Sequence, residues 1–115
     1  MEIKLPHSKY HEESIIADMM LFGADKVAVG LLVKDDFYFK SHWQLFKIMS
    51  RGAGKSIDDV ILEMVEVKPI RSLLRIIKTP VPSSMEWYCN YLRKLSKRRR
   101  AISAMVKKIK QLSTK

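Results

Sequence analysis

One short stretch of the sequence contains residues that could bind the phosphates of a nucleotide. Gly54, Lys55 and Ser56 match the end of the motif G-x-x-x-x-G-K-[ST], in which backbone N–H groups at a helix start surround the phosphates. The first glycine of the motif is absent, because Met49 occupies its position. The preceding residues have apolar side chains at helical spacing, whereas a phosphate-binding loop follows a buried strand. We therefore predict a solvated loop between two helices and no binding or hydrolysis of ATP.

Histidines and paired carboxylates are the other side chains that could do chemistry. His7 and His11 lie four residues apart, but neither belongs to the H-E-x-x-H pattern of zinc enzymes and no third ligand lies nearby. The aspartate pairs 35–36 and 58–59 are typical of loops and helix starts, and neighbours in sequence point in different directions. No Ser-His-Asp arrangement on a strand-turn-helix elbow is visible. We predict a protein that is not an enzyme and has no bound metal and no cofactor.

Length and composition limit the class of protein. A chain of 115 residues is long enough for one domain with a single hydrophobic core. No apolar run is long enough to cross a membrane, and the segment MEIKLPHSKY lacks the apolar part of a secretory signal. Cys89 is the only cysteine, which excludes an internal disulfide and a cysteine-rich metal site. We expect a soluble, cytoplasmic protein with a buried, inert thiol and no contact with a membrane.

Helix-capping residues and helical periodicity predict an all-α fold, a compact bundle of about five short helices. Ser8 fits the start of a first helix and Gly23 its end. Capping boxes at Ser41 and Ser56 begin two later helices, and Gly52 fits the residue that ends the first of these two. The expected core comprises residues 37–39 and Ile15, Ile16, Met19, Met20, Phe22, Leu45, Phe46, Met49, Ile57, Val60, Ile61, Met64, Ile70, Leu73, Leu74 and Ile77.

One long C-terminal helix follows this bundle. A capping box at Ser83 begins it, and without Gly or Pro it can continue to near Leu112, about 40 Å at 1.5 Å per residue. We divide the single domain into a globular helical head, residues 1–82, and a long basic helix, residues 83–115.

The long helix has more apolar surface than one core needs. We expect residues 102–112 to be exposed in the monomer and buried in a homodimer or hetero-oligomer, since large exposed apolar patches mark interfaces. For residues 87–95, packing against the head is an equal alternative. The predicted protein interface is Trp87, Tyr88, Tyr91, Leu95, Ile102, Met105 and Ile109.

The net charge of +10 is concentrated in the same helix. Residues 1–85 contain 12 Lys and Arg against 11 Asp and Glu, whereas residues 86–115 contain 10 against 1. The charges at 97–100 point nearly all round a helix, which argues against a helix dedicated to reading a DNA groove. We expect contact with an acidic protein partner and, secondarily, weak non-specific DNA binding. The predicted residues are Lys97, Arg98, Arg99, Arg100, Lys107, Lys108 and Lys110.

The order of several segments resembles the N-terminal domain of bacterial and phage replicative DNA helicases of the DnaB type. These segments are LPHSKYHEESIIADMM, VKDDFYFKSHWQLFKIM, SID and VPSSMEWYCNYLRKLSKRRR, which together cover most of the chain. The matching positions are Pro6, His7, Ser8, Glu13, Ser14, Asp36, Phe37, Tyr38, His42, Phe46, Ile57, Asp58, Pro82, Ser83, Glu86 and Tyr88.

The resemblance implies a non-catalytic all-α domain of DNA replication. In that family the ATPase motor is a separate domain, and the N-terminal domains pair through a helical hairpin and contact primase or loader proteins. This sequence has a shorter connection between Val67 and Ile70 and no second hairpin arm after the long helix. We therefore expect a partner to cover the apolar side of that helix.

Three functions remain open at this stage. The first is a protein-interaction module, either part of a helicase or a free-standing phage or mobile-element protein that binds a replicative helicase, primase or helicase loader. The second is a non-specific nucleic-acid-binding protein that uses the basic helix. The third is the helicase-binding domain of a primase, which has a closely related fold.

Overall fold

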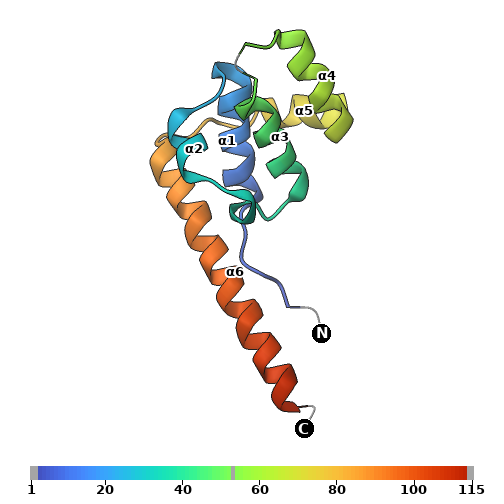
Figure 1. The fold of residues 1–115 in the computed structure, drawn as a ribbon. Helices are drawn as coiled ribbons and strands as arrows, with labels where there is room; N and C mark the ends of the chain where they lie inside the picture. Colours follow the sequence, from blue (N-terminus) through green and yellow to red (C-terminus); the bar gives the residue numbers. More distant parts are fainter. Residues whose placement is uncertain (1–2, 53, 114–115) are drawn as a thin grey trace.

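The computed structural model describes residues 3–52 and 54–113, which form α-helices and one 3₁₀ turn and contain no strand (Figure 1). The elements are α1 (Lys9–Phe22), α2 (Lys26–Leu31), η1 (Lys34–Asp36), α3 (Lys40–Ser50), α4 (Ile57–Val67), α5 (Ile70–Ile77) and α6 (Met85–Ser113). The predicted all-α class, with short helices followed by one long helix, is confirmed.

Two helix starts are capped as the sequence predicts. The Ser8 side chain accepts a hydrogen bond from the backbone N–H of His11 at the start of α1, and Ser56 does the same for Asp59 at the start of α4. Gly23 ends α1 with a φ of 88°, a conformation that glycine adopts without steric cost. These caps join residues close in sequence, which is why local spacing reveals them.

The predicted cap of α3 is wrong. The helix begins at Lys40, so Ser41 lies inside it. The N-cap residue is Phe39, whose side chain makes no capping hydrogen bond. The Glu12 carboxylate of α1 lies there instead and accepts hydrogen bonds from the backbone N–H groups of Tyr38, at 2.9 Å, and Phe39, at 3.4 Å. A negative charge at a helix N-terminus is stabilised by unpaired N–H groups and by the helix dipole.

Gly52 also differs from its predicted role. Helix α3 ends with Arg51 as its C-cap at a φ of −94°, and in the described part of the chain only Gly23 and Gly54 have positive φ. Gly52 is instead a point of close approach, because a Cβ there would lie 3.2 Å from the Met49 carbonyl oxygen and 3.3 Å from a Val60 methyl group. A glycine at this place lets α4 pack against the end of α3.

Helix α1 is the centre of the head. Ile15, Ile16 and Ala17 are completely buried, because α3, α5 and the first half of α6 pack around α1 (Figure 1). The expected aromatic core of residues 37–39 is only partly correct. Phe37 is buried, whereas Tyr38 is exposed and stacks on the His7 ring with 4.0 Å between ring centroids.

The residue that caps the start of α6 lies one position later than predicted. The Ser84 side chain, not Ser83, accepts the hydrogen bond from the Trp87 N–H, at 3.2 Å. From there α6 lies along the head and then projects beyond it (Figure 1). Its buried residues all lie in its first half and are Cys89, Leu92, Leu95, Ser96 and Arg99. We call the projecting part, residues 100–113, the α6 tip.

Candidate functional site

An open apolar groove lies on the head between the C-terminal end of α1, α4 and α5, and we call it the α1/α4/α5 groove. Its volume is about 820 Å³. Much of its lining is exposed to solvent, with exposed fractions from 47% to 78% for the large apolar residues Leu21, Phe22, Ile57, Ile61, Ile70 and Leu74. Exposed apolar surface of this kind is unusual on a monomer and marks interaction sites.

The groove exists because α4 and α5 bury only part of their apolar faces. Helix α4 buries Met64, and α5 buries Leu73 and Ile76. The apolar residues on the neighbouring turns of α4 and α5 lie at the edge of the head, where no other described element covers them. The prediction of a complete core is therefore wrong for Phe22 at the end of α1 and for Ile57, Ile61, Ile70 and Leu74.

A second apolar surface runs along the α6 tip. Met105, Ile109 and Leu112 are 58% to 63% exposed, and Ile102 is half-buried. Their spacing of three and four residues places these four side chains on one face of the helix, and we call them the apolar stripe. The predicted exposure of residues 102–112 is confirmed for Met105, Ile109 and Leu112.

The other predicted interface residues lie in the first half of α6, where the head covers some of them. Leu95 is buried and Tyr88 is half-buried, so both pack within the chain. Trp87 is 57% exposed and stacks on Tyr91, with 5.4 Å between ring centroids and 6° between ring planes. We call these two stacked residues the Trp87 patch, and its planar aromatic surface is available to another molecule.

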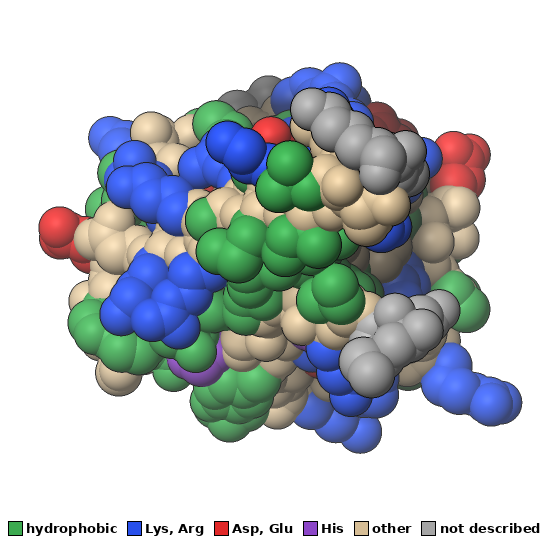
Figure 2. All heavy atoms as spheres, turned by 90° about the horizontal axis from the view of Figure 1, so that it is seen from below, with side chains coloured by type: hydrophobic (Ala, Val, Ile, Leu, Met, Phe, Trp, Pro, Cys, Tyr) green, Lys and Arg blue, Asp and Glu red, His purple; other side chains and the backbone are tan. Residues whose placement is uncertain are grey.

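Six of the seven predicted basic residues are exposed on α6, namely Lys97, Arg98, Arg100, Lys107, Lys108 and Lys110. Figure 2 views the molecule from the C-terminal end of α6 and shows hydrophobic side chains near the middle of that face, with Lys and Arg side chains on several sides. Acidic side chains lie at its margin (Figure 2). This end of the molecule therefore combines apolar surface with positive charge.

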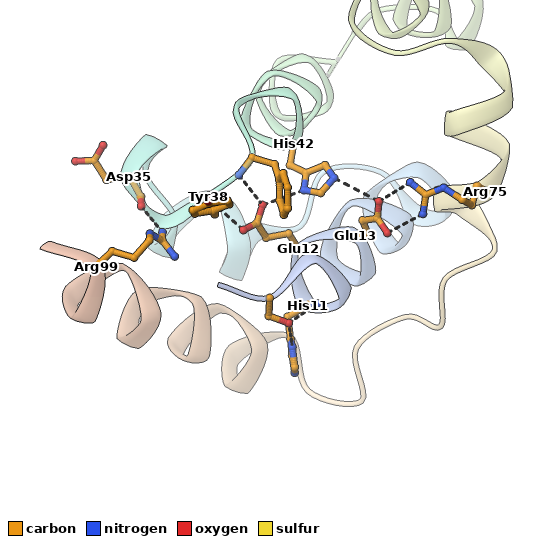
Figure 3. Close-up of polar contacts among 10 residues, drawn as sticks. His11, Glu12, Glu13, Asp35, Tyr38, His42, Arg75 and Arg99 are labelled. Carbon is orange, nitrogen blue, oxygen red and sulfur yellow. Dashed lines mark hydrogen bonds and ion pairs between the residues drawn. The ribbon is translucent and has the colours of Figure 1, made fainter. Parts of the chain in front are cut away.

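Arg99 does not belong with these exposed residues. It is 8% exposed, and its guanidinium donates one hydrogen bond to the carbonyl oxygen of Pro6, at 3.0 Å. A second goes to the carbonyl oxygen of Asp35, at 2.8 Å (Figure 3). The guanidinium carbon also lies 5.7 Å from the centre of the Tyr38 ring. The prediction of a partner contact is corrected for this residue, because its donors hold the head to α6. The sequence does contain a signal for this burial, because Arg99 lies seven residues after Leu92 and therefore on the same, buried face of α6.

A polar network with a buried centre and an exposed end at Arg75 joins α1, α3 and α5 (Figure 3). His42 Nδ1 lies 2.9 Å from a carboxylate oxygen of Glu12, and His42 Nε2 lies 3.4 Å from one of Glu13. Arg75 donates two hydrogen bonds to Glu13, at 3.0 and 2.8 Å. Local spacing does not reveal this network, because its members come from three helices.

Electrostatics favour the charged form of Glu13. Burial raises the pKa of this carboxyl, but the hydrogen bonds and charge of Arg75, together with the charges of His42 and Lys9, outweigh burial and leave the pKa lowered. Glu12, Glu13 and His42 are all buried and hydrogen-bonded to one another or to neighbouring groups, so the network connects helices.

The loop that resembles the end of a phosphate-binding motif has no strand before it, since α3 precedes it. Lys55 is exposed and forms an ion pair with Glu63 of α4, at 2.7 Å.

Within residues 3–52 and 54–113, no three His, Cys, Asp or Glu side chains are grouped closely enough to hold a metal ion. Burial raises the pKa of the Cys89 thiol to about 12, which disfavours the reactive thiolate.

Comparisons with known proteins give no relative. No family model, no curated protein and no solved structure matches the chain. Among the helices of the described residues, none has an apolar stretch long enough to cross a bilayer.

Proposed function

We propose that the chain is a non-catalytic protein-interaction domain of DNA replication, which binds a replicative helicase, primase or helicase loader. The observation that supports a binding role is the exposed apolar surface of the groove, the apolar stripe and the Trp87 patch, all in a chain of 115 residues. Such surface costs free energy in water unless another molecule covers it. The assignment to replication depends on the resemblance of the sequence to helicase N-terminal domains.

The charge of α6 suits an acidic protein partner. Charge complementarity increases the rate of association and fixes the orientation of the partner, while apolar anchors supply most of the affinity. The Trp87 patch is such an anchor, because Trp87 is rigidly stacked and Trp and Tyr are enriched among residues that dominate binding energies. The basic residues then guide the partner toward the patch.

The test is calorimetry with purified replicative helicase, primase and loader, each titrated separately with the full chain. Binding to at least one of them is expected, and Trp87→Ala should weaken it by at least tenfold. Leu62→Ala is the matched control, because Leu62 is also an exposed large apolar residue but lies outside the groove and the Trp87 patch. Absence of binding to all three proteins at micromolar concentrations would refute the replication role.

The exposed basic residues of α6 support a second candidate, non-specific binding of nucleic acid. Such binding typically has a dissociation constant of about 10⁻⁴ to 10⁻⁶ M at physiological salt and weakens steeply as salt is added. Labelled single-stranded and double-stranded DNA should be titrated across a salt series with the full chain and with the variant K97E/R98E/R100E. Nanomolar binding that this variant loses while it retains its protein partner would make DNA the principal ligand.

A further inference from the structure

The α1/α4/α5 groove and the apolar stripe are two uncovered apolar surfaces of one chain. Figure 1 places α4 and α5 at one end of the molecule and the C-terminal end of α6 at the other. The longest dimension of the structure is 57 Å. A single copy therefore cannot bring its own stripe into its own groove, whereas two copies can.

The shapes of the two surfaces correspond. Residues 102, 105, 109 and 112 follow the spacing i, i+3, i+7 and i+10, which is the pattern of anchors by which an amphipathic helix binds an apolar groove. The groove is lined by helices on its sides and is open to solvent, and its volume of about 820 Å³ can accept several aliphatic side chains. The stripe is entirely apolar, and the lining of the groove is mostly apolar, with Lys55 as its charged side chain, so docking removes few polar groups from water.

One wall of the groove, helix α4, has the charge opposite to that of the stripe, whereas α5 carries Arg71 and Arg75, the second of which is paired with Glu13. Helix α4 contains four acidic residues and no basic residue, and at 100° per residue Asp58 and Glu63 flank its apolar face. Glu63 is paired with Lys55, which leaves the acidic excess on the rest of α4. Lys108 and Lys110 flank the apolar stripe in the same manner on the α6 tip, which contains no acidic residue.

We propose that the α6 tip of one copy docks in the α1/α4/α5 groove of a second copy. This inference rests on the proposed function only for the expectation that the exposed apolar surfaces bind protein. It names a second copy as the partner of the groove and of the apolar stripe. The Trp87 patch stays accessible for a different partner. The contact joins two different surfaces, so it gives an isologous dimer when two copies make it reciprocally and a head-to-tail chain of copies when they do not.

Pairing of two α6 tips with each other is the main competing arrangement. It would leave the groove open to water and would place the lysines of one tip beside those of the other, which opposes association. Docking in the groove covers both apolar surfaces and brings lysines toward the acidic helix α4. The two arrangements predict different effects of substitutions in the groove.

The experiment is analytical ultracentrifugation of the full chain over a concentration series. Ile109→Asp, in the stripe, and Leu74→Asp, in the groove, should each weaken self-association at least tenfold, and both side chains are exposed, so the fold should tolerate them. A mixture of the two variants should associate more strongly than either alone, because the first variant retains an intact groove and the second an intact stripe.

Matched controls place the same charge outside the contact. Ser103→Asp lies farther round the α6 tip from the stripe, four residues before Lys107 and not before Lys108, and Leu62→Asp lies on α4 outside the groove, so both should associate as the unmodified chain does. Circular dichroism melting confirms that every variant is folded. A purely monomeric chain, a Leu74→Asp variant that associates normally, or a mixture no stronger than its components would each overturn the proposal. None of these outcomes affects binding of a replication protein at the Trp87 patch, which Trp87→Ala tests separately.

Discussion

Replacing Glu12 with alanine should destabilise the fold severely, because this one carboxylate connects α1 to the start of α3. Glu12 is completely buried and accepts hydrogen bonds at 2.9 Å from the Tyr38 N–H and at 3.4 Å from the Phe39 N–H. Its Oε1 also lies 2.9 Å from His42 Nδ1. Alanine would leave all three nitrogens without this acceptor.

The structure sets the size of this effect. Two short contacts are lost, and each buried polar group left unsatisfied costs about 1–3 kcal/mol, with charged acceptors at the upper end. We therefore expect a loss of about 3–5 kcal/mol, which agrees with the cost of breaking a buried ion pair. Glu12→Gln keeps the side-chain size but places an amide in a site surrounded by donors, and we expect it to cost about 1–3 kcal/mol.

Urea unfolding followed by circular dichroism measures both variants. At a slope of about 1–3 kcal/mol per M urea, the alanine variant should shift the midpoint by roughly 2 M. Glu66→Ala is the control, since Glu66 is an exposed glutamate on α4 and its loss should change stability by no more than about 0.5 kcal/mol. If Glu12→Ala cost no more than this control, the inference that Glu12 caps α3 from another helix would be wrong.

Three further predictions concern single side chains. Calorimetry should detect no binding of Mg-ATP, and Lys55→Ala should change the free energy of unfolding by at most about 0.5 kcal/mol; micromolar binding lost in Lys55→Ala would contradict this. Arg99→Ala should lower the free energy of unfolding by about 2–3 kcal/mol, because two hydrogen bonds from a charged donor are lost, whereas the exposed Arg98→Ala should have almost no effect in the same urea titration. Because the pKa of Glu13 is lowered, its contribution to stability is complete above its ordinary pKa of about 4.3 and is lost as the pH falls. The stability difference between the unmodified chain and Arg75→Met should therefore shrink when unfolding is measured at successively lower pH, and a difference independent of pH would contradict this.

Features that depend on neighbours in sequence could be predicted, and features that depend on distant residues could not. Ser8 and Ser56 each bind an N–H group three residues ahead, so the cap can be recognised from spacing alone. Ser41 has the same kind of spacing, yet Glu12 reaches the start of α3 from 27 residues away and replaces it. A cap supplied by another helix leaves no local pattern.

Periodicity predicted which side chains lie on an apolar face but not whether another element covers that face. Ile61 and Met64 belong to one face of α4, and Leu73 and Leu74 belong to one face of α5. Only Met64 and Leu73 are buried, because no other element of the described residues lies outside this edge of the head. The groove is therefore a property of the assembled helices. The apolar stripe could be predicted, since its spacing of three and four residues is visible in the sequence and the head buries residues only in the first half of α6.

The position of Arg99 explains how an exposed helix can present a fixed binding surface. The last buried residue of α6 is Arg99, and its hydrogen bonds to the carbonyls of Pro6 and Asp35 fix the direction in which the α6 tip leaves the head. An isolated helix shorter than about 12–15 residues is marginally stable in water, but the tip continues from turns that the head already orders. Docking the stripe in a groove then costs less conformational entropy than folding a disordered segment would, because the helix and its orientation exist before the contact forms.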